Sequence, residues 1–259
     1  MSHDPFPAYR FSRALLREPA ASVVCGLRAV DRGDPSLELF HLEHAAYRAI
    51  LENAGLETHL LPALSDWPDS VFVEDPAMVL PEGAILFRMA APSRAGEPDT
   101  VREALQKFVP VTLLENGHVD GGDILVTGPK IFAGLSKRTD KDGLDAMGAI
   151  VAGWGYELVG VDMPEGLLHL KTGCALLDEE TILAVEPLKE TFSDFRVLTL
   201  PEGEEAAANA VRVNDIVLLA AGYPRTEELL DRGGYNVRTT KVSQAQLLDG
   251  GLSCLSIRF

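Results

Sequence analysis

The chain has few cysteines, no long hydrophobic run and fewer basic than acidic residues, and each shortage excludes a class of protein. Its three cysteines, Cys25, Cys174 and Cys254, are too few and too widely spaced for a disulfide framework. Cys-x-x-Cys and His-x-x-x-His pairs are absent, which argues against a structural zinc site. The longest apolar run, residues 216–221, is far shorter than the roughly 20 residues that span a bilayer.

The charge balance excludes another group of functions. Asp and Glu number 39 and Lys and Arg 23, which gives a net charge of −16. Nucleic acids and anionic membranes require basic patches, so neither is expected as a partner, whereas a small cationic substrate is compatible with the charge. Apolar residues make up 46% of the 259, which excludes global disorder. Whether the chain forms a homodimer is left open.

The N-terminal segment and the thiols together suggest a compartment. Residues 1–20 contain three prolines and no apolar stretch of the kind found in a secretory signal. We therefore expect a cytoplasmic protein with free thiols.

Alternating helical and strand-like segments indicate an α/β protein. Helices are expected at 36–55, 99–108, 139–154 and 225–232. In the first, Leu39, Leu42, Ala46, Ala49 and Ile50 recur at steps of three and four, which predicts that they form the buried face. Short apolar runs that read as strands occupy 22–27, 70–80, 122–128, 173–178, 181–185, 210–222 and 252–259.

The strand-like runs recur with a rhythm. Polar or glycine-rich turns open five of them, at residues 74–75, 121–123, 172–173, 209 and 250–251, at steps of about 37 to 50 residues. The run at 22–27 would be a sixth, deviant member. Such spacing suggests a repeated β/α unit, whose turns would converge near one axis. An ordinary α/β sheet is the alternative, because all turns favour Gly and Asp.

Carboxylates in an apolar setting form the first candidate site, at residues 66–76. Asp69, Glu74 and Asp75 lie in a strand-like segment, where unpaired charges would be costly. A planar guanidinium is a natural partner, and it could belong either to a ligand or to an arginine of the protein.

Three further segments could carry chemistry. Asp120 and Asp123 flank a double glycine, but the spacing of an EF-hand calcium loop is missing. His169 lies in an apolar run, where a histidine is usually a core residue. Cys254 follows two glycines; it is either a buried apolar side chain or a thiol that faces a cleft.

Read together, these segments resemble the dimethylarginine dimethylaminohydrolase family of the guanidine-modifying pentein superfamily. The resemblance covers roughly residues 17–259. It is carried by PDSVFVEDP (68–76), SRAGE (93–97), VDGGDIL (119–125), SKRT (136–139), LHLKTG (168–173), AAGYPRT (220–226) and DGGLSCLSIRF (249–259).

The resemblance implies a fold and a reaction. The fold would be a five-bladed α/β propeller of ββαβ units around a central channel, with residues 1–259 in a single domain. The reaction would be hydrolysis of Nω-methylated arginines to citrulline and a methylamine, with no metal or organic cofactor. The partner would be a small cationic amino acid.

The resemblance also implies roles for individual residues. Cys254 would be the nucleophile, His169 the general acid and base, and Asp120 the carboxylate that orients His169. The substrate-binding residues would fall into groups that take the guanidinium (Glu74, Asp75, with Phe72 lining the pocket), the α-ammonium (Asp69 and the carbonyl of Leu27) and the α-carboxylate (Arg94, Arg138), with the carbonyl of Leu248 as a further contact.

Two positions depart from some relatives. Asp120 is one methylene shorter than the glutamate found there in some of them, so its link to His169 could be longer. Ala95 follows Arg94 where some relatives have a second arginine. The Pro-, Ala- and Gly-rich segment 88–99 is expected to form a mobile flap over the site.

Three alternatives remain open. Arginine deiminases share this chemistry but carry an aspartate two residues after the histidine, where this chain has Lys171. Amidinotransferases share the Cys-His pair but pass the amidine to an amine, and their chains are usually longer. A binding-only pentein would have no need of that pair.

Overall fold

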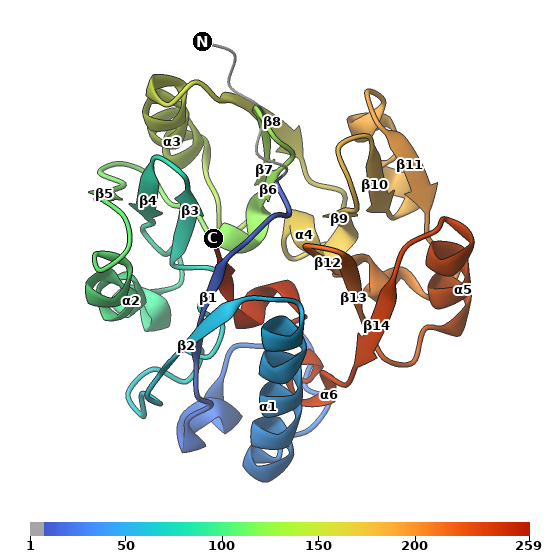
Figure 1. Ribbon diagram of the computed structural model, residues 1–259. Helices are drawn as coiled ribbons and strands as arrows, with labels where there is room; N and C mark the ends of the chain where they lie inside the picture. Colours follow the sequence, from blue (N-terminus) through green and yellow to red (C-terminus); the bar gives the residue numbers. More distant parts are fainter. Residues whose placement is uncertain (1–7) are drawn as a thin grey trace.

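The computed structural model describes residues 8–259, in which the strands form five three-stranded sheets. Figure 1 shows the sheets arranged in a ring, with helices at its periphery. In every sheet the first strand is antiparallel to the second, and the second is parallel to the third. This is the five-bladed α/β propeller of the pentein fold, so the expected fold class is confirmed.

The ring closes because the chain end supplies the inner strand of the first blade. That blade pairs β15 (Ile257–Arg258) with β1 (Arg13–Arg17), and β1 with β2 (Glu57–Leu61). Between β1 and β2 lie the 3₁₀ helix η1 (Ala21–Cys25) and helix α1 (Leu37–Asn53). The pairing brings the C-terminal segment, which contains Cys254, next to segments more than 150 residues away in sequence.

The second and third blades each contain a long helix between their parallel strands. The second has β3 (Ala77–Leu80), β4 (Gly83–Leu86), η2 (Pro92–Arg94), α2 (Glu97–Leu105) and β5 (Val111–Leu113). The third has η3 (Gly121–Asp123), β6 (Ile124–Val126), β7 (Lys130–Leu135), α3 (Lys141–Gly153) and β8 (Glu157–Asp162).

The fourth and fifth blades complete the ring. The fourth has α4 (Leu170–Gly173), β9 (Cys174–Leu176), β10 (Thr181–Ala184), η4 (Glu186–Leu188), η5 (Glu190–Phe192) and β11 (Arg196–Thr199). The fifth has η6 (Glu205–Ala208), β12 (Val211–Val213), β13 (Ile216–Ala220), α5 (Pro224–Arg232) and β14 (Val237–Thr240). The chain then runs through α6 (Ser243–Gln246) and η7 (Ser253–Leu255) to β15.

The four expected helices are present, but the buried face predicted for the first is wrong. In α1 the core residues are Phe40, His44, Tyr47 and Leu51, whereas Leu39 is 50% and Leu42 61% exposed. Both sets recur at helical spacing. The larger aromatic side chains face the core, because they bury more apolar area than the leucines one position away. The expected ends of α1 are confirmed: the Ser36 side chain accepts from Leu39 N–H, and Gly55 has φ +95°.

Two expected strands also differ. Residues 21–25 form the 3₁₀ helix η1 rather than a strand, so the proposed sixth repeat is wrong. Residues 70–76 form turns, and only 77–80 are a strand, so Glu74 and Asp75 precede β3 instead of interrupting it. The five predicted turns nevertheless all lie just before the inner strand of a blade, namely β3, β6, β9, β12 and β15. The rhythm in the sequence therefore marks the ends of the blades near the axis.

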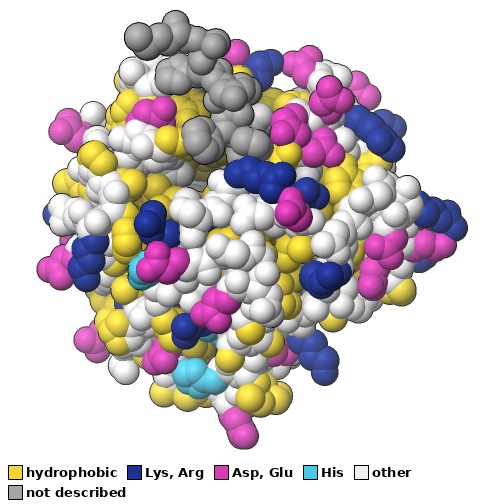
Figure 2. Space-filling model, in the orientation of Figure 1, with side chains coloured by type: hydrophobic (Ala, Val, Ile, Leu, Met, Phe, Trp, Pro, Cys, Tyr) yellow, Lys and Arg dark blue, Asp and Glu magenta, His cyan; other side chains and the backbone are white. Residues whose placement is uncertain are grey.

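The surface carries charges of both signs. On the face seen in Figure 2, the described Lys and Arg side chains are interspersed with Asp and Glu. Within the described residues, no helix is both long enough and apolar enough to span a membrane. We expected no secretory signal in residues 1–20. Of these, residues 1–7 lie outside the described range.

Candidate active site

A small pocket of about 30 Å³ lies where the turns that precede the inner strands converge. Its lining contains nine of the eleven predicted site residues, all except Asp120 and Glu74, which lie directly behind it. The lining residues are Leu27, Asp69, Phe72, Asp75, Arg94, Arg138, Leu168, His169, Leu248, Asp249, Gly250 and Cys254. They come from every blade except the fifth and from the C-terminal segment that closes the ring.

Cys254 is a half-buried free thiol in η7. The backbone N–H of Gly251 donates to its Sγ at 3.5 Å, and the N–H of Glu74 donates to its carbonyl at 3.3 Å. Burial raises the pKa of the thiol to about 12, and the negative charges of Asp75 and Glu74 act in the same direction. In the unliganded protein Cys254 is therefore a thiol rather than a thiolate at neutral pH.

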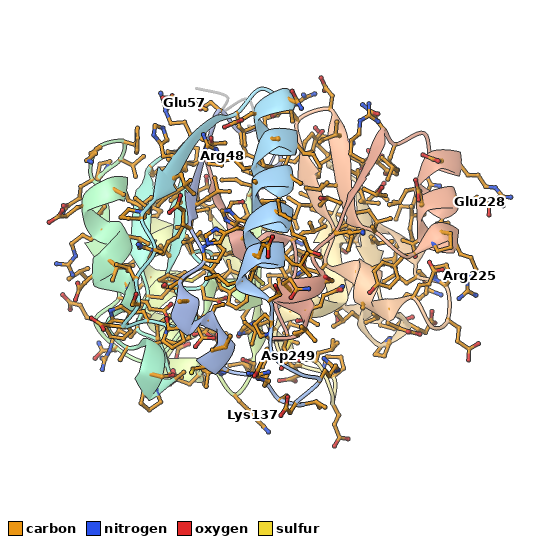
Figure 3. All side chains as sticks on the ribbon, turned by 90° about the horizontal axis from the view of Figure 1, so that it is seen from below. Arg48, Glu57, Lys137, Arg225, Glu228 and Asp249 are labelled. Atoms are coloured by element: carbon orange, nitrogen blue, oxygen red, sulfur yellow. The ribbon has the colours of Figure 1, made fainter. Side chains whose placement is uncertain are left out.

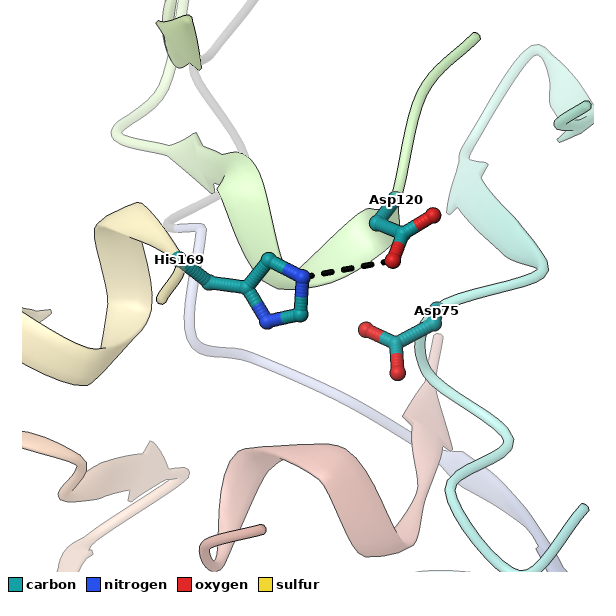
Figure 4. Close-up of side chains that lie close together, drawn as sticks. All are labelled: Asp75, Asp120 and His169. Atoms are coloured by element: carbon teal, nitrogen blue, oxygen red, sulfur yellow. Dashed lines mark hydrogen bonds and ion pairs between the residues drawn. The ribbon is translucent and has the colours of Figure 1, made fainter. Parts of the chain in front are cut away.

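His169 and Asp120 form a buried pair. Nε2 of His169 lies 3.3 Å from Oδ2 of Asp120, and Figure 4 shows Nδ1 on the side of the ring away from that bond. The pair is thus direct, although Asp120 is the shorter carboxylate. Burial disfavours the charged imidazole, but the hydrogen bond to Asp120 and the charges of Asp75 and Asp123 outweigh it and raise the pKa to about 9. His169 is therefore protonated at neutral pH.

The double glycine at 121–122 exists because His169 needs the space. A Cβ on Gly122 would lie 2.6 Å from Nδ1 of His169 and 3.0 Å from Oδ1 of Asp75. A Cβ on Gly121 would lie 2.1 Å from the carbonyl oxygen of Glu74. Any side chain at either position would push apart the segments that carry the reactive groups.

Asp75 is held in place by a buried arginine. Nη1 of Arg94 lies 2.6 Å from Oδ2 of Asp75, and the N–H of Gly122 donates to Oδ1 at 3.1 Å. Arg94 also donates to Glu97 from both Nε and Nη2, and from Nη2 to the carbonyl of Phe72. Burial disfavours the Asp75 carboxylate, but Arg94 outweighs burial and lowers its pKa. The charged carboxylate is available to a cationic substrate.

Arg94 is a buried, paired residue that anchors the segment around it. Arg94 is only 4% exposed and spends most of its donors on Asp75, Glu97 and Phe72. Glu97 and Pro98 are buried as well. The expectation of a mobile flap over 88–99 is at odds with these contacts, because Arg94 ties the middle of the segment to the floor of the site. The α-carboxylate role of Arg94 stays a prediction.

Glu74 faces away from the pocket. Its Oε1 lies 2.5 Å from Nζ of Lys171 and 2.9 Å from Nη2 of Arg258, whose Nη1 in turn donates to the carbonyls of Ser253 and Ser256. Of the two predicted guanidinium-binding carboxylates, Asp75 therefore lines the pocket, and Glu74 lies behind Cys254 with its charge compensated.

The opposite end of the pocket could hold an amino acid backbone. Asp69 is buried, and its Oδ1 accepts from the N–H of Leu27 at 2.9 Å. Arg138 is 19% exposed and reaches Asp120 at 3.6 Å. Asp249 accepts from Ala29 N–H and lies 3.3 Å from Arg32, which ties the loop that carries Leu27 to the segment of Leu248.

Asp75, Asp120 and His169 are the described residues whose ligand atoms cluster as a metal site would, within 4.8 Å of one another. The guanidinium groups of Arg94 and Arg138 already lie against the two carboxylates. Two adjacent cationic groups disfavour a metal cation there, so we assign no metal to these residues.

Both the sequence and the fold of this chain match known proteins. A family profile described as arginine deiminase matches residues 53–221, more than half of the chain. Over 254 residues the chain is 39% identical to the N(G),N(G)-dimethylarginine dimethylaminohydrolase of Pseudomonas aeruginosa, covering 96% of this chain and 100% of that protein. The chain belongs to the dimethylarginine dimethylaminohydrolase family.

Other relatives of this dimethylarginine dimethylaminohydrolase family member agree in sequence or in fold. The Streptomyces coelicolor protein of the same name is 33% identical over 95% of this chain and 96% of its own length. A crystal structure of a cysteine variant of the Pseudomonas enzyme, complexed with citrulline, has a TM-score of 0.94 and covers 97% of this chain and 100% of that one. The N-terminal domain of the cyanobacterial arginine dihydrolase ArgZ, at 23% identity and a TM-score of 0.84, shares the fold.

Several residues of this family member that build the site were not assigned a role from the sequence. Arg258 and Glu97 are partners of Glu74 and Arg94, and Asn209 accepts from Ser253 N–H and donates to the Lys171 carbonyl. Asp123 was noted beside the double glycine, but nothing indicated its partners. A search for charged residues at apolar positions could have found Asp123, whereas Arg258 and Glu97 occur in segments of ordinary composition.

Proposed function

We propose that this protein hydrolyses Nω-methylated arginines to citrulline and methylamine or dimethylamine. The observation that carries the proposal is the convergence of Cys254, His169 and Asp75 on one pocket. Support comes from the 39% identity, over nearly the full length, to an enzyme named for this activity. The pocket offers a thiol, a protonated imidazole and a carboxylate, which is what cleavage of a guanidinium C–N bond requires.

Binding places the substrate cation beside the thiol. Asp75 receives the guanidinium, while Asp69 and the carbonyl of Leu27 receive the α-ammonium group, with the carbonyl of Leu248 as a further polar contact. Arg138 receives the α-carboxylate. The substrate's positive charge near Sγ opposes the effects that raise the thiol pKa, so binding itself promotes ionisation of Cys254.

The first half-reaction forms a bond to sulfur. The Cys254 thiolate attacks the central guanidinium carbon, and the bond from that carbon to the methylated nitrogen breaks. His169 donates its proton to the departing amine, which leaves a cationic S-alkylthiouronium on Cys254. With a pKa of about 9, His169 carries that proton at neutral pH.

The second half-reaction restores the enzyme. Neutral His169 takes a proton from water as the water oxygen attacks the thiouronium carbon. The C–S bond breaks, citrulline forms and Cys254 leaves as a thiolate. The second proton of the attacking water leaves the new carbonyl oxygen and goes to the released amine, so the sum is one water consumed and one alkylammonium produced.

Lys171 argues for methylated substrates over arginine. The aspartate of arginine deiminases at this position adds a second carboxylate for the unmethylated guanidinium. Here Lys171 lies 2.5 Å from Glu74 and compensates one carboxylate instead. A methylated guanidinium has fewer N–H groups that need an acceptor, so it loses less binding energy than arginine does when this carboxylate is missing.

The deciding experiment measures ureido product from asymmetric dimethylarginine, monomethylarginine, arginine and agmatine, assayed side by side. We expect kcat/KM to be highest for the methylated amino acids. Turnover of arginine above dimethylarginine would assign the chain to the deiminase reaction.

We place the reaction in the cytoplasm, where Cys254 would stay reduced alongside the free thiols of Cys25 and Cys174.

A further inference from the structure

Asp123 is a buried carboxylate that joins three segments of the site. Its Oδ1 accepts from the N–H of Leu170, the residue after His169, at 3.0 Å. Its Oδ2 accepts from the hydroxyls of Ser136 and Thr139, both at 2.7 Å. Asp123 itself is 0% exposed and takes no part in the chemistry described above.

Each of these partners carries a reactive or binding residue. Thr139 Oγ1 accepts from the N–H of Asp120 at 3.1 Å, and Ser136 Oγ accepts from the N–H of Arg138 at 2.9 Å. The single carboxylate therefore fixes the backbone on both sides of the His169–Asp120 pair and at Arg138.

The hydrogen-bond pattern identifies Asp123 as ionised. Ser136 Oγ accepts from two backbone N–H groups, those of Arg138 and Thr139, so its own proton can go only to Asp123. The N–H of Leu170 can only donate. A protonated Asp123 would compete with these donors. Burial raises the pKa of Asp123, while nearby His169 and the three donors oppose that effect.

The charges that face His169 come from every element around it. Asp120 and Asp123 flank the double glycine, Asp75 precedes β3, and Cys254 lies in η7. On the cationic side are Arg138 beside Asp120, Arg94 beside Asp75, and Lys171 in α4 beside Glu74. Each of those cations pairs with a carboxylate other than Asp123, whereas the hydrogen bonds that Asp123 accepts come from two hydroxyls and one amide, and its charge also acts on His169.

We propose that Asp123 is a positioning residue that holds the His169, Asp120 and Arg138 segments together, and that its negative charge keeps the imidazole of His169 protonated for acid catalysis. The catalytic part of this inference rests on the proposed function. The effect on His169 does not, because it follows from the hydrogen bond that holds Asp123 to the residue after His169 and from the charges around the imidazole.

The principal test is Asp123→Asn, which keeps the shape and removes the charge. Removing a negative charge lowers the pKa of the imidazole, and we expect the NMR titration midpoint of His169 to fall by about one pH unit. The titration is done on Cys254→Ser protein, and His169→Asn assigns the signal. In protein that retains Cys254, we expect kcat for dimethylarginine to fall about tenfold or more, and the pH-profile limb that follows His169 to move to lower pH.

Glu204→Gln is the matched control. Glu204 is also buried and accepts from the N–H and hydroxyl of Thr226 and from the N–H of Arg225, in the fifth blade. The Glu204→Gln variant should lose stability as Asp123→Asn does, but it should leave the titration midpoint of His169 unchanged. A midpoint in Asp123→Asn within about 0.3 units of its parent would overturn the electrostatic role.

Ser136→Ala tests the positioning role separately and also serves if Asp123→Asn does not fold. It keeps the charge of Asp123 but frees the backbone at Arg138 and Thr139. We expect a severalfold rise in KM for dimethylarginine with an unchanged His169 midpoint. An unchanged KM would overturn the positioning role. If the parent enzyme shows no turnover, the proposed function fails, and the His169 titration still decides the electrostatic role.

Discussion

Two hollows lie near the buried Glu74–Lys171 pair, and they differ in size and in the groups that line them. The larger, about 1170 Å³, has walls that include Phe11, Val79 and Trp154. The smaller, about 30 Å³, holds Cys254 and His169. In Figure 3, Asp249 of the small pocket lies in the lower half of the view, whereas Glu57 lies near the top. The N–H of Glu57 donates to the carbonyl of Ser12, which lines the large cavity.

The difference shows that volume alone does not mark a site. The large cavity is lined mainly by side chains with no reactive group, and its charged floor of Glu74, Lys171 and Arg258 is internally paired. In the small pocket, burial and neighbouring charges change the pKa values of Cys254, His169 and Asp75 together. Groups with mutually perturbed pKa values are what distinguish a reactive site from a void.

The largest expected difference between the two hollows is the effect of replacing the one cysteine that each contains. Cys254→Ser should lower kcat by at least about 10³-fold while dimethylarginine still binds, because the nucleophile is lost and the pocket is kept. Cys174, in the wall of the large cavity, donates from Sγ to the Leu170 carbonyl. Cys174→Ala should retain kcat within about threefold, since a buried cysteine acts mainly as a small apolar side chain. Steady-state kinetics measures kcat for both variants, and isothermal titration measures dimethylarginine binding. An equal loss of kcat in the two variants would contradict the assignment of the reactive thiol to the small pocket.

The next effect concerns the acid. His169→Asn should lower kcat by about 10²–10⁴-fold, the usual value of general acid–base catalysis. His118→Gln is a control, because that histidine is partly exposed, is bound to Asp140 and does not line the small pocket. Rate measurements on both variants decide it. A small loss in His169→Asn would place the proton donor elsewhere.

A third effect concerns the α-carboxylate. Arg138→Ala should raise KM for dimethylarginine by about 10- to 100-fold, as expected when a charge-assisted contact is lost. Agmatine lacks that carboxylate, so its KM should change little. An equal loss for agmatine would show that Arg138 acts instead through its contact with Asp120.

The smallest effect tests the boundary between the hollows. The positive charge of Lys171 lowers the thiol pKa of Cys254. Lys171→Met should therefore raise it, and alkylation of Cys254 by iodoacetamide at a fixed pH near 9 should slow severalfold. The exposed Lys137, labelled in Figure 3, gives the control Lys137→Met, which should alkylate at the parental rate. Faster alkylation in Lys171→Met would mean that the pair only blocks access to the thiol.

Parts of this structure could be predicted because they depend on local sequence. The ends of α1 follow from the Ser36 cap and Gly55, and the turns that open the inner strands follow from their Gly and Asp residues. The family and the fold were predicted and are confirmed. The catalytic and binding roles, and the assignment of residues 1–259 to one domain, stay predictions.

Other parts could not be predicted because they depend on which segments meet. Two helical stripes of α1 look equally apolar, and only packing against the first blade decides that Phe40 and Tyr47 are buried. Nothing near Arg94 in the sequence shows that Asp75 would be its partner. Likewise, Glu74 and Asp75 are adjacent, yet one faces Lys171 and the other the pocket.

The sequence by itself determined the reactive groups, their order and the rhythm of the turns that carry them, because residue identity and backbone preference are local properties. The tertiary structure decided which carboxylate lines the pocket, which arginine is already paired, and that hydrogen bonds of Asp123 link the segments of His169 and Arg138. Those outcomes depend on burial and on distances between blades. Closure of the ring by β15 is what brings Cys254 within reach of Glu74, 180 residues earlier in the chain.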